Sequence, residues 1–163
     1  MKSIVYLDMD GVLVNLASEI DRQFLNAELP AHLREEPDLI EGLFENPEPI
    51  TGAVNAVHLL NNSGIYELFI ATTAPWNNPG SLVHKRLWIE KHFGNLFYKK
   101  MFVTHRKDLL IGDYLIDDRM ANGAAQFRGQ LLHFGVDYVT GKPNTFPNWE
   151  SVIEKLLHND KNF

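Results

Sequence analysis

Short apolar segments alternate with amphipathic ones along most of this chain. Ser3 to Leu7, Glu67 to Thr72, Met101 to Thr104, Tyr114 to Ile116 and Leu131 to Phe134 are apolar and rich in β-formers, so each predicts a buried strand. Strands that alternate with helical segments indicate a parallel sheet with helices on both faces. We therefore expect an α/β, Rossmann-like fold with residues 1–163 in a single domain.

Helical spacing fills the stretches between these strands. Val14 to Leu29 places Leu16, Ile20 and Phe24 on one face, and residues 54–60 repeat the pattern up to Gly64. Ser81 is a candidate N-cap for a helix that ends before Gly94. Four prolines and an acidic piece with near-helical apolar spacing (39–44) occupy residues 30–49. We expect residues from about 15 to 49 to form a small helical cap inserted after the first strand.

Composition and charge narrow the class of protein. A hydrophobic content of 45% is sufficient for a core, and a net charge of −6 argues against a partner that is a nucleic-acid polymer. The absence of cysteine excludes disulfides, thiolate metal sites and cysteine nucleophiles. No apolar run is long enough for a signal peptide or a membrane span. We expect a soluble, cytoplasmic protein without a membrane partner.

Reactive side chains collect where the predicted strands end. Asp8 and Asp10 follow the first strand, Thr72 and Thr73 the second, Lys107 comes shortly after the third, and Asp117 and Asp118 end the fourth. Ligands of open parallel sheets bind at this carboxyl edge. The set suits phosphoryl transfer, because a carboxylate can attack phosphorus, a second can act as acid and base, and magnesium prefers oxygen ligands.

The motifs resemble those of the haloacid dehalogenase (HAD) superfamily, in order along nearly the whole chain. DMDGVL (8–13) is similar to the first motif, the strand ending in Thr72 to the second, Lys107 to the third, and LIDDR (115–119) to the fourth. TTAPW, KRLWIEKHFG and THRK further resemble the 5'(3')-deoxyribonucleotidases.

The resemblance implies a role for each site residue. Asp8 would be the nucleophile and Asp10 the general acid and base. Thr72, Thr73 and Lys107 would bind the phosphoryl group. Mg²⁺ would be held by the Asp8 carboxylate, the Asp10 backbone carbonyl and Asp118, with Asp117 in support. The implied substrate is a small phosphorylated compound, a deoxynucleoside monophosphate.

Several alternatives remain open at this level. The substrate could be another small phosphorylated metabolite, and a phosphomutase or a catalytically silent HAD-fold binding protein would share the acidic residues. Lys85 and Lys91 fall on a helical pattern and are interpreted as a solvated face. Trp76 and Phe44 either line a substrate pocket or act in packing and loop anchoring. Leu16 stands where the mammalian relatives carry phenylalanine, which reduces the stacking surface for a base.

Overall fold

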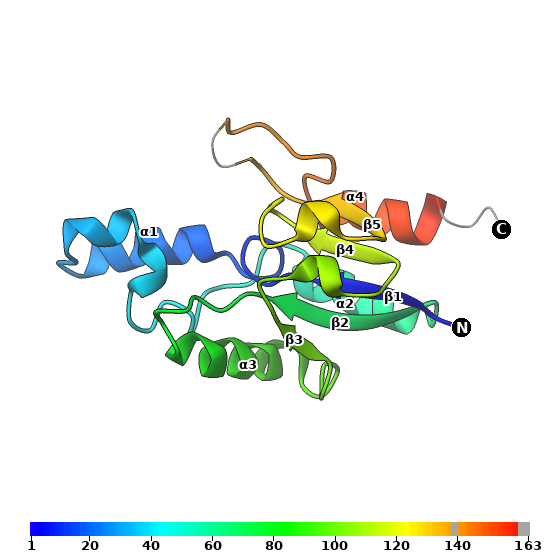
Figure 1. Ribbon diagram of the computed structural model, residues 1–163, viewed down its shortest axis with the longest axis horizontal. Coiled ribbons are helices and arrows are strands. Elements are labelled where there is room, and N and C mark those ends of the chain that lie inside the picture. The colour runs from blue at the N-terminus through cyan, green and yellow to red at the C-terminus, as the bar shows by residue number, and fades with distance from the viewer. Residues whose placement is uncertain (138–139, 160–163) are drawn as a thin grey trace.

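Five parallel strands form the centre of the protein in a computed structural model that describes residues 1–137 and 140–159 (Figure 1). The sheet order is β3-β2-β1-β4-β5. The strands are β1 (Ser3–Leu7), β2 (Tyr66–Thr72), β3 (Met101–Val103), β4 (Tyr114–Asp117) and β5 (Gln130–His133). All five predicted strands are present within a residue or two of the expected bounds, and the α/β class is confirmed.

Strand order places β1 between β2 and β4, which are far from each other in sequence. Val5 pairs with Leu68 on one side and Tyr114 on the other. The ladder continues one step past β1, because the Asp8 amide donates to the Ile116 carbonyl at 2.9 Å. At such a topological switch point, the connections from two neighbouring strands run in opposite directions. A crevice opens there at the carboxyl ends of the strands.

The two faces of the sheet carry different kinds of helix. Strand alternation directs Val5 and Leu7 into one core, together with α2 (Ala53–Asn62), α3 (Gly80–Phe93) and α4 (Trp149–Ile153). Tyr6 points to the other face, which is covered by the single-turn 3-10 helices η3 (Lys107–Leu109) and η4 (Ala124–Gln126). Helices therefore lie on both faces as predicted, but the three α-helices share one of them. The connections 104–113 and 118–129 each contain only one 3-10 turn.

Residues 15–49 form a small cluster of their own beside the sheet. Helix α1 (Leu16–Asn26) begins at Asn15, whose side chain accepts from the Ser18 amide, and it stands away from the strands (Figure 1). The turns η1 (Ala31–Arg34) and η2 (Pro37–Leu39) follow. Their apolar side chains make a separate core of Ile40, Leu43 and Phe44 with Leu16, Ile20, Phe24, Leu29 and Leu33 packed against it. An antiparallel bridge between Val14 and Pro49 joins the two ends of this segment.

Three local predictions can be compared directly with the structure. Gly64 and Gly94 adopt positive φ just after α2 and α3, as expected of helix ends. The apolar spacing at 39–44 does not make an α-helix, because Pro37 opens a 3-10 turn and Gly42 takes a φ of +73°. Ser81 is not an N-cap. The helix already begins at Gly80, and Ser81 is buried inside it.

Within the residues that the structure describes, no helix has the length and apolar character needed to cross a bilayer.

Candidate active site

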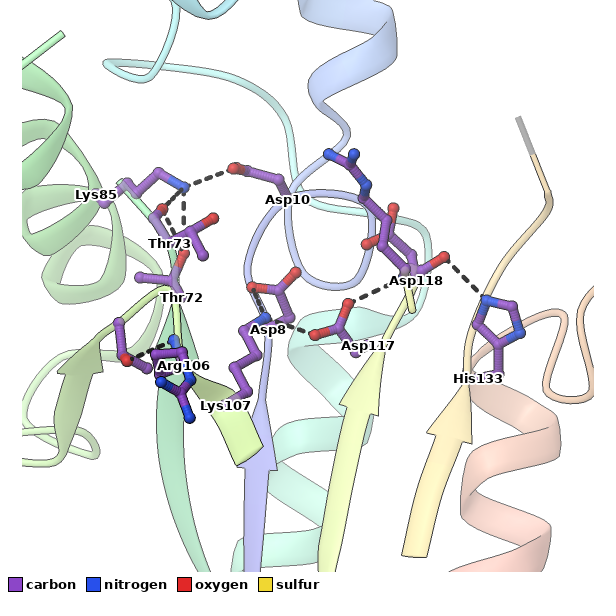
Figure 2. Close-up of polar contacts among 12 residues, drawn as sticks. Asp8, Asp10, Thr72, Thr73, Lys85, Arg106, Lys107, Asp117, Asp118 and His133 are labelled. Atoms are coloured by element: carbon purple, nitrogen blue, oxygen red, sulfur yellow. Dashed lines mark hydrogen bonds and ion pairs between the residues drawn. The ribbon is translucent and has the colours of Figure 1, made fainter. Parts of the chain in front are cut away.

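Loops after β1, β2 and β4 meet the turn η3 around one cavity of about 320 Å³ at the carboxyl edge of the sheet (Figure 2). Predicted site residues that line it are Asp8, Asp10, Thr73, Lys107, Asp117 and Asp118. The segment 15–49 supplies another wall through Leu16, Ala17, Ile20, Pro37 and Asp38. Tertiary structure therefore brings together acids, a cation and a threonine that the sequence places up to about a hundred residues apart.

Lys107 connects the two strand ends on either side of the switch point. Its ammonium lies 3.0 Å from Asp8 Oδ1 and donates to Asp117 Oδ2 at 2.5 Å, with the side chain almost fully buried. Burial favours the neutral amine, but attraction to Asp8 and Asp117 outweighs it, so the pKa of Lys107 is raised. The lysine is therefore a fixed positive charge against the proposed nucleophile.

Asp8, Asp117 and Asp118 bring carboxylate oxygens within 4.8 Å of one another in a buried setting. Burial, and then repulsion from Asp8, raises the pKa of Asp117 to about 7, although Lys107 opposes the shift. Crowded, buried carboxylates of this kind become favourable when a cation neutralises them. The donor set is made of hard oxygens, which fits a divalent ion such as Mg²⁺. The Asp10 carboxylate is not part of this cluster; its predicted ligand was the backbone carbonyl.

Asp10 instead turns its carboxylate toward helix α3 (Figure 2). Lys85 donates to Asp10 Oδ2 at 2.5 Å, to the Thr73 carbonyl at 2.8 Å and to Thr72 Oγ1 at 3.1 Å. Nothing in the described part of the chain hydrogen-bonds to the other oxygen, Asp10 Oδ1. Burial raises the pKa of Asp10; Lys85 opposes the rise and Asp8 reinforces it.

The interpretation of Lys85 as a solvated residue was wrong. Its side chain is 2% exposed, and its ammonium lies 4.9 Å from the centre of the Phe44 ring. Helical spacing alone cannot separate this lysine from Lys91, which is on the same helix and is exposed. The only sequence signal was position: Lys85 lies in the second turn of the helix that follows β2.

The two threonines occupy different places. Thr73 lines the cavity, whereas Thr72 is fully buried and its hydroxyl donates to the Thr73 carbonyl at 3.2 Å while it accepts from Lys85. Thr73 is thus the threonine at the cavity wall, and Thr72 is a hydrogen-bond partner of the buried Lys85.

The three residues considered as substrate contacts lie in different places. Leu16 lines the cavity. Phe44 is buried in the small core of segment 15–49, as its packing interpretation expected. Trp76 is 89% exposed and borders a different, shallow pocket with Glu35 and Glu36, so it does not anchor its loop by burial and does not line the cavity at Asp8.

Solved structures with the same fold are HAD hydrolases. YfnB of Bacillus subtilis, described as a HAD hydrolase and solved with magnesium bound, aligns with a TM-score of 0.59 at 13% identity over 96% of this chain and 99% of its own. A HAD family hydrolase of Deinococcus radiodurans, solved with phosphate and sodium, gives 0.50 at 15% identity over 94% and 87%. The fold of this chain is that of the HAD hydrolases.

The family model described as "5' nucleotidase, deoxy (Pyrimidine), cytosolic type C protein" matches residues 35–158. A protein of Vibrio phage KVP40 named for a 5'(3')-deoxyribonucleotidase activity is 41% identical over 98% of this chain and 88% of its own length. The human cytosolic-type 5'(3')-deoxyribonucleotidase is 29% identical over 95% and 81%. The chain belongs to this nucleotidase family of phosphatases and has the fold of the HAD hydrolases.

Proposed function

We propose that this protein is a magnesium-dependent phosphomonoesterase that releases phosphate from deoxynucleoside 5'- or 3'-monophosphates through a phosphorylated Asp8. The observation that carries the proposal is the pairing of Asp8 with Lys107 at 3.0 Å in a cavity that also contains Asp10. A carboxylate nucleophile, a fixed cation and a separate acid are what the two-step hydrolysis requires. The names of the phage and human relatives support the nucleotide substrate.

In the first step, an Asp8 oxygen forms a bond to phosphorus while the bond from phosphorus to the ester oxygen breaks. The leaving oxygen takes a proton from Asp10, whose raised pKa favours the protonated acid at the start. Lys85 holds Asp10 Oδ2, and the buried Oδ1 has no hydrogen-bond partner among the described residues, so we assign the proton to Oδ1. Lys107 and Thr73 both line the cavity. Lys107 provides positive charge for the phosphoryl oxygens, and Thr73 provides polar groups.

In the second step, water attacks phosphorus of the aspartyl phosphate and gives its proton to the Asp10 carboxylate. The bond between phosphorus and Asp8 breaks, so inorganic phosphate leaves and both carboxyl groups return to their starting states. Mg²⁺, when bound by Asp8 and Asp118 with Asp117 in support, supplies positive charge against the phosphate and the crowded carboxylates.

We also propose that residues 15–49 act as a cap that selects the substrate. Leu16, Ala17 and Asp38 of this segment form part of the wall of the cavity that Asp8 and Asp10 also line. The cap is held to the sheet domain by Asn78, which donates to the Asp38 carbonyl at 2.8 Å, and by Trp88, which donates to the Pro47 carbonyl at 2.8 Å. Because the catalytic residues act only on the phosphoryl group, discrimination between substrates depends on this wall.

A cytoplasmic location is also part of the proposed function.

Release of inorganic phosphate should be measured over deoxy- and ribonucleoside monophosphates and a set of sugar phosphates. We expect dUMP or dTMP to be hydrolysed, with a modest preference over ribonucleotides and over nucleotides with other bases. A sugar phosphate preferred by more than about a hundred-fold in kcat/KM, or roughly 2.7 kcal/mol of transition-state binding, would overturn the nucleotide substrate. No release from any compound with magnesium present would favour a catalytically silent binding protein.

A further inference from the structure

The peptide unit that links Asp118 to Arg119 is held at both of its polar ends. The Arg119 amide donates to Asp117 Oδ1 at 2.9 Å, and the Asp118 carbonyl lies 3.2 Å from His133 Nε2 (Figure 2). A carbonyl can only accept, so the contact is a hydrogen bond when the imidazole carries its proton on Nε2. One side chain from β4 and one from β5 therefore clamp the backbone directly after Asp118.

This clamp lies where the regular ladder between β4 and β5 stops. Asp117 is paired with His133, and the Phe134 amide donates to the Asp117 carbonyl at 2.9 Å. Asp118 is the first residue beyond strand β4, so its carbonyl has left the strand-to-strand pattern. The ring of His133 reaches the carbonyl from the end of β5, and the side chain thus continues the pairing for one further residue.

We infer that His133 is a positioning residue for the magnesium site. By fixing the carbonyl of Asp118, it limits rotation of the backbone that carries the Asp118 carboxylate, and so holds this carboxylate in the buried cluster with Asp8 and Asp117. Magnesium accepts little deviation from octahedral geometry, so a ligand already in place binds it more tightly than one that must be ordered first. The inference rests on the proposed function, because it assumes that Asp118 is a metal ligand.

Two substitutions separate this role from general packing. In His133→Gln the amide nitrogen falls near the place of imidazole Nε2, so the bond to Asp118 can form again. In His133→Asn the nitrogen falls near the place of Nδ1 and does not reach the carbonyl. His58→Asn, at an exposed histidine on α2, is the matched control. Magnesium binding is measured directly by isothermal titration calorimetry without substrate, and thermal unfolding in EDTA reports stability without metal.

His133→Asn should weaken magnesium binding by about ten-fold or more, the usual scale for residues that orient metal ligands. The magnesium affinity of His133→Gln should stay within about three-fold of the wild-type value. The magnesium affinity of His58→Asn should equal the wild-type value. Raising magnesium should restore much of the kcat of His133→Asn.

Unchanged magnesium affinity in His133→Asn, or equal losses in the asparagine and glutamine variants, would overturn the inference while the proposed function stands. A wild-type protein that hydrolyses its substrate but binds no magnesium would remove the metal from the proposed function, and this inference with it.

Discussion

Replacement of Lys85 by methionine tests the least expected feature of the site. Methionine keeps most of the length and volume of lysine but removes the ammonium, and with it the bonds to Asp10, Thr72 and the Thr73 carbonyl at 2.5, 3.1 and 2.8 Å. If Lys85 were on a solvated face, the change would stay within about 0.5 kcal/mol, as most surface substitutions do. The structure predicts a larger effect.

Removing one partner of a buried ion pair costs about 3–5 kcal/mol, because the other charge stays buried without compensation. The Asp10 side chain is 27% exposed and can regain some hydration, which reduces that cost. We therefore expect Lys85→Met to lower the free energy of unfolding by about 2–3 kcal/mol. For a domain of this size, that loss lowers Tm by roughly 4–12 °C.

The variant should also change the pH dependence of turnover. Lys85 lowers the pKa of Asp10 against the effects of burial and of Asp8, so its removal raises that pKa further. Ionised Asp10 is needed to activate water, and the ascending acid limb of the kcat profile should move to higher pH.

Urea unfolding measures the stability, and Lys91→Met on the exposed part of the same helix is the control. In a double-mutant cycle with Asp10→Asn, the pair should show a coupling of about 1–3 kcal/mol. Lys85→Met with wild-type stability and an unshifted profile would refute the assignment of Lys85 to the site.

Three further outcomes are expected. Asp8→Asn should abolish turnover with little change in Tm, since the side chains are nearly isosteric, and near-normal rates would mean that another carboxylate is the nucleophile. Activity should vanish in EDTA and return with Mg²⁺, and Asp118→Asn should raise the magnesium concentration needed for half-maximal rate; full turnover in metal-free buffer contradicts both. Leu16→Phe should sharpen base preference in kcat/KM by up to about a hundred-fold, because a base stacked on an aromatic ring gains about 1–3 kcal/mol, and unchanged ratios across bases would place the base elsewhere.

The sequence alone determined the sheet and most of the catalytic edge. Buried parallel strands are continuous apolar runs, so SIVYL and YELFIAT were recognisable without tertiary information. Polar residues at the ends of such runs must lie at one edge of a parallel sheet. For that reason Asp8, Lys107 and Asp117 could be predicted to meet, and the structure brings them together.

Only the tertiary structure decided which long or aromatic side chains face the site. Two lysines of helix α3 have different environments. Lys85 is buried between the β2 end and the Phe44 ring, whereas Lys91 is exposed and donates to Asn46 at the surface. For Trp76 and Phe44 the sequence left both a pocket role and a packing role open, and the tertiary structure buries Phe44 and exposes Trp76.

The contact between His133 and Asp118 likewise depends on where the β4–β5 ladder stops, which is a property of strand pairing between distant segments. Apolar periodicity specifies which residues leave water. The partner of a buried polar group is chosen by the packing of whole elements, and a single segment of sequence does not contain that information.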